Sequence, residues 1–389
     1  MTVANDEQWP TPFKEWLTRT ASAADDIADS GVRRLKRRFG HEDIPKIQPY
    51  MGYATSERIY LHGRVLTNPP IDSDYQTDHW WRNLQNAVQR FVSNEVPGVT
   101  IEGAFDGHTA TTTSDSEGYF HLTLDRPPQE SAAFWDMAKL RIKNHPRARR
   151  ESDQTTCHLL SVPSEAKFAI ISDVDDTILH TGATNIVTMA KLTFFGNART
   201  RAPLDGVAAL YERLQCEDGN TPINPIFYVS SSPWNLYDLL EDFLELNAIP
   251  RGPLLLRDLG FDENKFLKSG HEHKLDKARR LIRAYKHLPF LLFGDSGQED
   301  ARLYAAAAEE FPDRIRGIFI RDVDPMISSS HDAKVDQYVR QAAQAGVPMY
   351  LIKDSVQAAE IAAEHGWLDR DALPTIVQAT RRDTERPPV

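Results

Sequence analysis

Three aspartates in four positions follow an apolar run in the segment FAIISDVDDT, residues 168–177. The run 168–171 is typical of a strand that is buried on both faces of a sheet. Asp173, Asp175 and Asp176 would therefore bring negative charges together where little water can screen them. Their repulsion calls for a compensating cation or an unusual arrangement of protons, so the segment predicts a functional site.

Strand-like and helix-like stretches alternate from about residue 165 onward. The strand-like runs end at Ser172, at Val229, at Phe293 and near Ile320, and helical stretches follow over 236–246, 274–285 and 300–311. A last unit joins a strand over 348–352 to a helix over 355–365. This order predicts a Rossmann-like α/β domain with a parallel sheet, in which ligands gather at the carboxyl ends of the strands.

The chain before residue 165 has a different pattern. Short runs in which apolar and polar residues alternate, such as 58–66 and 119–124, predict a small β-sandwich over 45–164. Apolar residues at spacings near three and four predict an amphipathic helix within 1–44, which ends in five basic residues out of six at 33–38. This helix would either pack on its own protein or lie on an anionic membrane. The α/β domain is predicted over 165–380, followed by a flexible tail over 381–389.

Composition narrows the class of protein. A net charge of −11 argues against general nucleic-acid binding. Two cysteines, Cys157 and Cys216, are too few for a disulfide scaffold or a zinc cluster and fit a reducing cytosol. The N-terminus has no apolar core typical of a secretory signal, and no stretch approaches the roughly 18 apolar residues that span a bilayer. We expect a cytoplasmic protein, with membrane contact that is at most peripheral.

Four polar features fall at the ends of the predicted strands or at the start of a helix. They are the aspartates that begin at Asp173, then Ser230, then Lys274, and finally the pair Asp295 and Asp300. Each is weak evidence alone, because a strand-end aspartate is often a turn or helix-cap residue. A calcium loop is excluded, because its fifth, sixth and twelfth positions would hold Thr, Ile and Thr.

Taken together, the four features resemble the haloacid dehalogenase superfamily of phosphotransferases over about 167–325. The family motifs are a strand ending in Asp-x-Asp-x-Thr, a Ser or Thr that closes the next strand, a Lys at a helix start, and Gly-Asp followed by further acids. They correspond here to Asp173, Asp175 and Thr177, to Ser230, to Lys274, and to Asp295 and Asp300. Lys268 and Lys277 fit the third motif less well.

Phosphoryl transfer requires a nucleophile, neutralisation of the phosphate charge and a proton for the leaving oxygen. Asp173 is the candidate nucleophile, which would form an aspartyl-phosphate. Asp175 would protonate the leaving alcohol and then activate water. Thr177, Ser230 and Lys274 would hold the phosphate oxygens.

Magnesium is the predicted cofactor, because Mg²⁺ prefers hard oxygen ligands and keeps several waters. The carboxylates of Asp173 and Asp295 and the backbone carbonyl of Asp175 are the candidate ligands. Asp300 would act from outside this set, by orienting the magnesium waters or Lys274.

The strings DVDDTILHTG, FYVSSSPWNLY, GPLLLRD and LLFGDSGQEDARLY resemble a narrower family, the magnesium-dependent phosphatidate phosphatases related to the fungal actin-patch enzyme. The resemblance implies hydrolysis of phosphatidate to diacylglycerol, and it leaves protein partners unknown. Two alternatives remain open: a phosphomonoesterase or phosphotransferase for a soluble metabolite or a phosphoprotein, and a non-catalytic scaffold. The complete set of acids argues against the scaffold.

Overall fold

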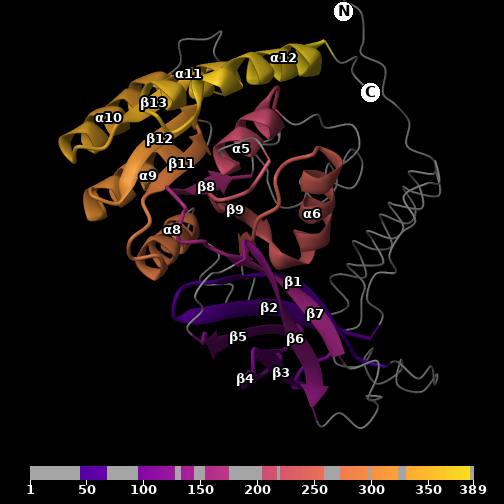
Figure 1. Ribbon diagram of the computed structural model, residues 1–389. Helices are drawn as coiled ribbons and strands as arrows, with labels where there is room; N and C mark the ends of the chain where they lie inside the picture. The colour runs from indigo at the N-terminus through magenta and orange to yellow at the C-terminus, as the bar shows by residue number, and fades with distance from the viewer. Residues whose placement is uncertain are drawn as a thin grey trace, which may run out of the picture. The chain divides into compact units, whose positions relative to one another are not determined.

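The computed structural model describes residues 44–67, 95–127, 133–143, 154–174, 204–216, 220–257, 272–296, 299–322 and 330–385. The predicted N-terminal helix lies outside these residues. The chain divides by its contacts into residues 1–44 and one compact unit over 45–389. The described strands of this unit form two sheets, one of seven strands and one of six (Figure 1).

The seven-stranded sheet comprises β1 to β7 and has the order β4-β3-β6-β7-β1-β2-β5. Its strands are β1 (Lys46–Ala54), β2 (Arg58–Leu66), β3 (Thr100–Phe105), β4 (His108–Thr113), β5 (Tyr119–Asp125), β6 (Trp135–Lys143) and β7 (Gln154–Ser161). Alternate side chains of these strands, such as Ile59, Leu61, Ile101 and Leu140, form one buried core. The structure therefore confirms a β-rich region.

The predicted sandwich differs from the structure in how the strands are joined. Strand β1 pairs with β2 in the antiparallel sense and with β7 in the parallel sense. It thereby joins β4-β3-β6-β7 and β2-β5, which would otherwise form separate sheets, into one hydrogen-bonded sheet. The edge strands β4 and β5 approach one another, so the sheet curves around its core.

The six-stranded sheet is parallel at each of its pairings and has the order β10-β9-β8-β11-β12-β13. Its strands are β8 (Ala169–Asp173), β9 (Ile226–Pro233), β10 (Leu254–Arg257), β11 (Phe290–Asp295), β12 (Ile315–Arg321) and β13 (Met349–Ile352). This confirms the predicted α/β class with a parallel sheet. The chain builds outward from β8 to β9 and β10, and then crosses over to β11 on the other side. A switch point therefore lies between β8 and β11, and ligands bind at such points in open parallel sheets.

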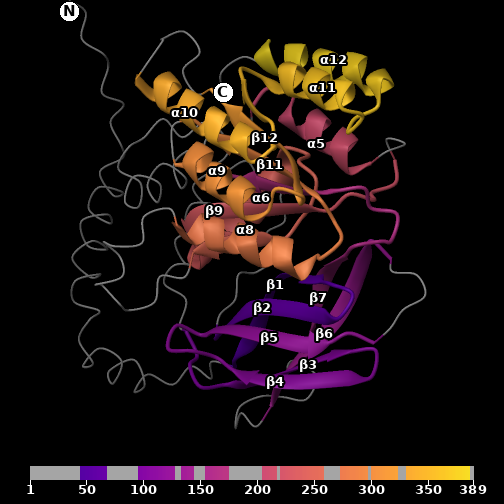
Figure 2. The ribbon, with the colours of Figure 1, turned by 90° about the vertical axis from the view of Figure 1, so that its left-hand side faces the viewer.

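Helices cover both faces of this sheet. Residues of α5 (Val207–Gln215), α6 (Tyr237–Leu246), α11 (Ser355–Glu364) and α12 (Leu373–Thr384) share one core with Ile170 of β8. Residues of α8 (Glu272–Ala284), α9 (Asp300–Glu310) and α10 (Ser330–Gln344) share the other core with Ile171. Figure 2 shows α8, α9 and α10 side by side. Consecutive residues of β8 point to opposite faces, which explains why the whole strand is apolar up to its polar end.

Three strands end later in the structure than the sequence predicted. Strand β9 continues past Val229 to Pro233, and β8 and β11 include their terminal aspartates. The predicted tail is wrong over residues 381–384, because α12 extends to Thr384. Asp383 and Thr384 anchor this last turn: Asp383 Oδ2 accepts from the Gly206 N–H, and the Thr384 hydroxyl donates to Asp205.

The two sheets are connected through β1. The Met51 N–H donates to the Tyr237 hydroxyl at the start of α6, at 2.8 Å, and the Tyr285 hydroxyl just after α8 donates to the Ala54 carbonyl at 3.1 Å. Among the described residues, no helix has the length and apolar character needed to cross a membrane.

Candidate active site

The site begins with the ends of three neighbouring strands. Asp173 is the last residue of β8 and lies opposite Val229 of β9. Ser230 is the residue that follows Val229 in β9. On the other side of β8, Ser172 lies opposite Phe293 of β11, which ends at Asp295. The parallel register therefore brings segments that are far apart in the sequence to one edge of the sheet, at the switch point.

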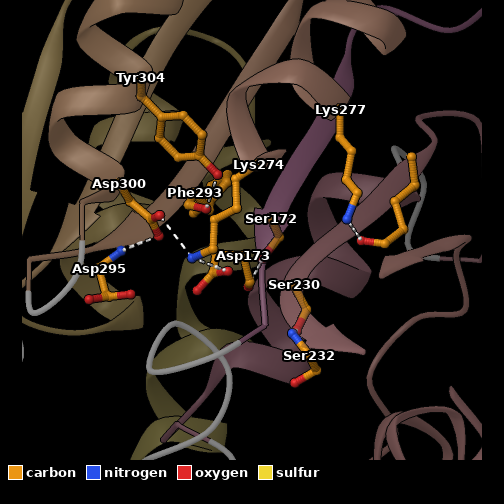
Figure 3. A network of polar contacts seen from close by, with 11 residues as sticks. Ser172, Asp173, Ser230, Ser232, Lys274, Lys277, Phe293, Asp295, Asp300 and Tyr304 are labelled. Atoms are coloured by element: carbon orange, nitrogen blue, oxygen red, sulfur yellow. Dashed lines mark hydrogen bonds and ion pairs between the residues drawn. The ribbon is translucent and has the colours of Figure 1, made fainter. Parts of the chain in front are cut away.

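Lys274 enters this edge from the first turn of α8. Its ammonium nitrogen lies 2.7 Å from Asp173 Oδ1 and 2.9 Å from Asp300 Oδ1, and all three side chains are fully buried (Figure 3). A buried ammonium is stable only when it is paired, and the two carboxylates provide that pairing. Lys274 therefore links the first and the fourth sequence motif.

The close approach of α9 to β11 depends on a glycine. Asp300 is the first residue of α9, and its Oδ2 accepts a long hydrogen bond, 3.4 Å, from the Asp295 N–H. A Cβ atom at Gly294 would lie 2.7 Å from Asp300 Cβ and 2.9 Å from Asp300 Oδ2. The Gly-Asp motif therefore has a steric cause, because only glycine lets the helix start so near the strand.

Three buried carboxylates form a cluster that could bind a metal ion. Oxygen atoms of Asp173, Asp295 and Asp300 all lie within 4.8 Å of one another. Within the described part of the chain, the ammonium of Lys274 contacts two of the three carboxylates, and the full burial of the cluster makes any excess of negative charge costly. Carboxylate oxygens are ligands for hard divalent cations. The residues present therefore fit a cation of this kind.

Ser230 and the alternative lysines are also placed by the structure. Ser230 is buried, and its hydroxyl oxygen accepts from the Ser232 N–H at 2.9 Å (Figure 3). The ammonium of Lys277 donates to the Leu255 carbonyl at 3.0 Å. Lys274 is thus the lysine of α8 that contacts the aspartates. Lys268 lies outside the described residues.

The remaining predicted site residues, Asp175 and Thr177, lie outside the described part of the chain, as does Asp176. Their predicted roles stay predictions. The predicted site residues that are described, Asp173, Ser230, Lys274, Asp295 and Asp300, share one edge of the sheet.

Two buried tyrosines border the aspartates, and sequence reasoning did not find them. The Tyr211 hydroxyl of α5 lies 2.8 Å from Ser172 Oγ, and the Tyr304 hydroxyl of α9 donates to the Phe293 carbonyl at 3.2 Å. Burial raises the pKa of both hydroxyls well above the ordinary value, and the nearby aspartate charges raise it further. Both tyrosines are therefore neutral. Their sequence signal is only the apolar spacing of a helix face.

The fold and the site together define an α/β protein with a buried acidic centre at the switch point of a parallel sheet. Residues 168–322 match the family model described as "Phosphatidate phosphatase APP1, catalytic domain". The match confirms the predicted resemblance to the phosphatidate phosphatase family. It contains every described site residue.

Two curated proteins are similar in sequence to this chain. The phosphatidate phosphatase APP1 of Saccharomyces cerevisiae is 31% identical over 289 residues, which cover 70% of this chain and 47% of that protein. An uncharacterised protein of Schizosaccharomyces pombe is 30% identical over 158 residues, 40% of this chain and 25% of that protein. The chain thus spans about half of the first relative and a quarter of the second.

A carbohydrate acetylesterase from Xanthomonas citri aligns over 87% of this chain and 74% of its own, with 10% identity and a TM-score of 0.30.

Proposed function

We propose that this protein is a magnesium-dependent phosphatase of the haloacid dehalogenase type, with a Rossmann-like catalytic domain, that hydrolyses phosphatidate to diacylglycerol and phosphate. The observation that carries the proposal is the buried group Asp173, Lys274 and Asp300. It lies at the sheet edge within the segment that matches the phosphatidate phosphatase family model. The relative from Saccharomyces cerevisiae supports the choice of substrate.

The reaction is assigned to the chain's own residues in two steps. In the first, a carboxylate oxygen of Asp173 attacks phosphorus and the ester P–O bond breaks, while Asp175 gives its proton to the leaving alcohol. In the second, Asp175 takes a proton from water, whose oxygen attacks the aspartyl-phosphate and releases inorganic phosphate. Lys274, Ser230 and Thr177 hold the phosphate oxygens during both steps.

The contact between Lys274 and Asp173 supports the first step. The Lys274 ammonium lies 2.7 Å from Asp173 Oδ1, and this contact orients the carboxylate before a substrate arrives. Asp300 holds the same ammonium from the other side at 2.9 Å, so Lys274 has little freedom to turn away. This fixed geometry matters because reacting groups must be held close to their productive positions.

Mg²⁺ would be held by the carboxylates of Asp173 and Asp295 and by the carbonyl of Asp175. When bound, it would neutralise negative charge on the phosphate oxygens. Asp300 belongs to the same oxygen cluster in the structure, while its Oδ1 contacts Lys274. Because of that contact, we assign to Asp300 the role of positioning Lys274.

We further propose that the protein is a cytoplasmic enzyme. It would meet its substrate at a membrane surface, because phosphatidate is a membrane lipid.

The test is phosphate release by the full chain from phosphatidate in mixed micelles and from a soluble aryl phosphate, each with Mg²⁺ or with excess EDTA. We expect release from phosphatidate that requires Mg²⁺ and that yields diacylglycerol. Release from the aryl phosphate alone would point to a soluble phosphomonoesterase instead. The absence of release from a panel of phosphate esters would favour a non-catalytic scaffold.

A further inference from the structure

The two strands that end in site aspartates are each held near that end by a buried tyrosine hydroxyl from a helix that lies later in the chain. For β8 the tyrosine is Tyr211 of α5, and for β11 it is Tyr304 of α9. Both side chains are 1% exposed. The two arrangements also touch, since the ring of Tyr211 meets that of Phe293 edge to face at 5.4 Å between centroids.

In the hydrogen bond between Tyr211 and Ser172, the donor can be identified because each hydroxyl has a single hydrogen. Ser172 Oγ donates its single hydrogen to the carbonyl oxygen of Asp173 at 2.7 Å. The Ser172 hydroxyl can therefore only accept from the Tyr211 hydroxyl, 2.8 Å away. Two hydrogen bonds thus run in series: the Tyr211 hydroxyl donates to Ser172 Oγ, and the Ser172 hydroxyl donates to the main-chain carbonyl of Asp173. Hydrogen bonds in such a chain strengthen one another.

The protonation of the tyrosines keeps this direction constant. Burial, followed by the charges of Asp300, Asp173 and Asp295, raises the pKa of Tyr304 well above its ordinary value. Burial is also the main cause of the raised pKa of Tyr211, to which the charge of Asp173 adds. Each hydroxyl is thus protonated at neutral pH and able to donate.

Asp173 is consequently held from two directions. Lys274 contacts the carboxylate, and the chain from Tyr211 contacts the main-chain carbonyl of the same residue. At β11, Tyr304 holds the Phe293 carbonyl, two residues before Asp295, and belongs to the helix that begins with Asp300.

We propose that Tyr211, acting through Ser172, and Tyr304 are positioning residues that set the main chain of the strand ends carrying Asp173 and Asp295. The kinetic part of this inference rests on the proposed phosphatase function. The geometric part does not, because it concerns where the aspartates lie in the folded protein. Loss of contacts that orient an active group typically costs about 10- to 100-fold in activity.

The test compares Tyr211→Phe, Ser172→Ala, the double variant and Tyr304→Phe with Tyr285→Phe as the matched control. Tyr285 is also buried and also donates to a carbonyl, that of Ala54 at 3.1 Å, but away from the aspartates. We expect kcat to fall about 10- to 100-fold in the Tyr211 and Tyr304 variants, with little change in KM. Tyr285→Phe should keep the kcat of the unmodified protein.

The double variant tests the chain itself. If Tyr211 acts through Ser172, Tyr211→Phe and Ser172→Ala together should cost no more than the worse single variant. Fully additive losses would overturn the relay. An unchanged kcat in both tyrosine variants, or an equal loss in Tyr285→Phe, would overturn the positioning role.

Crystal structures of Tyr211→Phe and Tyr285→Phe give a readout that needs no activity. We expect the Asp173 carboxylate to move away from the Lys274 ammonium in the first and to stay in contact in the second. An unmoved Asp173 in Tyr211→Phe would contradict the inference. If the unmodified protein hydrolyses no phosphate ester, the proposed function fails, and these structures still decide the positioning role.

Discussion

The ammonium nitrogen of Lys274 lies 2.7 Å from a carboxylate oxygen of Asp173, and neither side chain has any exposure to solvent. The same nitrogen contacts Asp300 at 2.9 Å, so one cation is shared between two buried carboxylates. Taking these charges out of water is expensive, and each member is tolerable only while the others are present. The interaction therefore affects both the stability and the proposed chemistry of the site.

Replacement of Lys274 by methionine should destabilise the protein and abolish the proposed phosphatase activity. The variant leaves Asp173 and Asp300 buried without their cation, and breaking a buried pair in this way costs about 3–5 kcal/mol. Urea denaturation measures this cost. Lys277→Met is the matched control on the same helix, because Lys277 donates to the Leu255 carbonyl. It should retain activity. A fully active and stable Lys274→Met variant would refute the assigned role.

Replacement of Asp173 by asparagine should stop turnover while the protein stays folded. The amide has the shape of the carboxylate but is no nucleophile, and removal of a nucleophile lowers kcat by roughly 10⁴-fold or more. Asp175→Asn should have a comparable effect because of its predicted proton transfer. Asp276→Asn is the control, since Asp276 lies on the exposed face of α8 and pairs with Arg279. Full activity in either site variant would exclude the mechanism.

An alanine at Gly294 should damage the site by steric overlap. The new Cβ would lie 2.7 Å from Asp300 Cβ and 2.9 Å from Tyr304 Cε2, and overpacking of this kind costs about 1–3 kcal/mol. Gly317→Ala is the control, because it creates a similar steric clash away from the aspartates. Its new Cβ would lie 2.6 Å from Trp367 Cη2. Thermal unfolding should show losses in both variants. Only Gly294→Ala should also lose activity, and equal kcat values would show that Asp300 tolerates displacement.

Glu241 should make stability fall as pH rises. Burial, and next the charge of Asp238, raises the pKa of this carboxyl from 4.5 to about 7. Between these two values the folded state binds a proton that the unfolded state has released, so the free energy of unfolding decreases with pH. The loss is up to about 3 kcal/mol above pH 7, at 1.36 kcal/mol for each unit of pKa.

The variant Glu241→Gln should remove this dependence. Its side-chain oxygen can still accept from the Tyr237 hydroxyl, which lies 3.2 Å from Glu241 Oε1. We expect the variant to be more stable than the unmodified protein at pH 8, with a difference that shrinks toward pH 5 in urea denaturation. Glu245→Gln, on the exposed side of the same helix, is the control. A constant difference across this pH range would contradict the assignment.

The alternation of strands and helices could be predicted from the sequence because it depends on the local periodicity of apolar residues. Buried parallel strands are apolar along their whole length, and the turn residues that follow them are polar. The strands that end at Asp173 and Asp295, and the helices after β9 and β11, were located in this way to within a few residues. The pairing of β1 with both β2 and β7 could not be predicted from the sequence, because pairing partners that are far apart in the chain leave no local pattern.

The sequence by itself determined the chemical content of the site: which acids end which strands, and in what order the serine, the lysine and the Gly-Asp pair follow. It could do so because parallel strands carry their functional groups at one edge. Only the tertiary structure showed that Lys274 contacts both Asp173 and Asp300, and that Tyr211 and Tyr304 border the strand ends. Those contacts depend on how α5, α8 and α9 pack on the sheet. The packing is set by many weak apolar contacts at once, and no single stretch of sequence contains it.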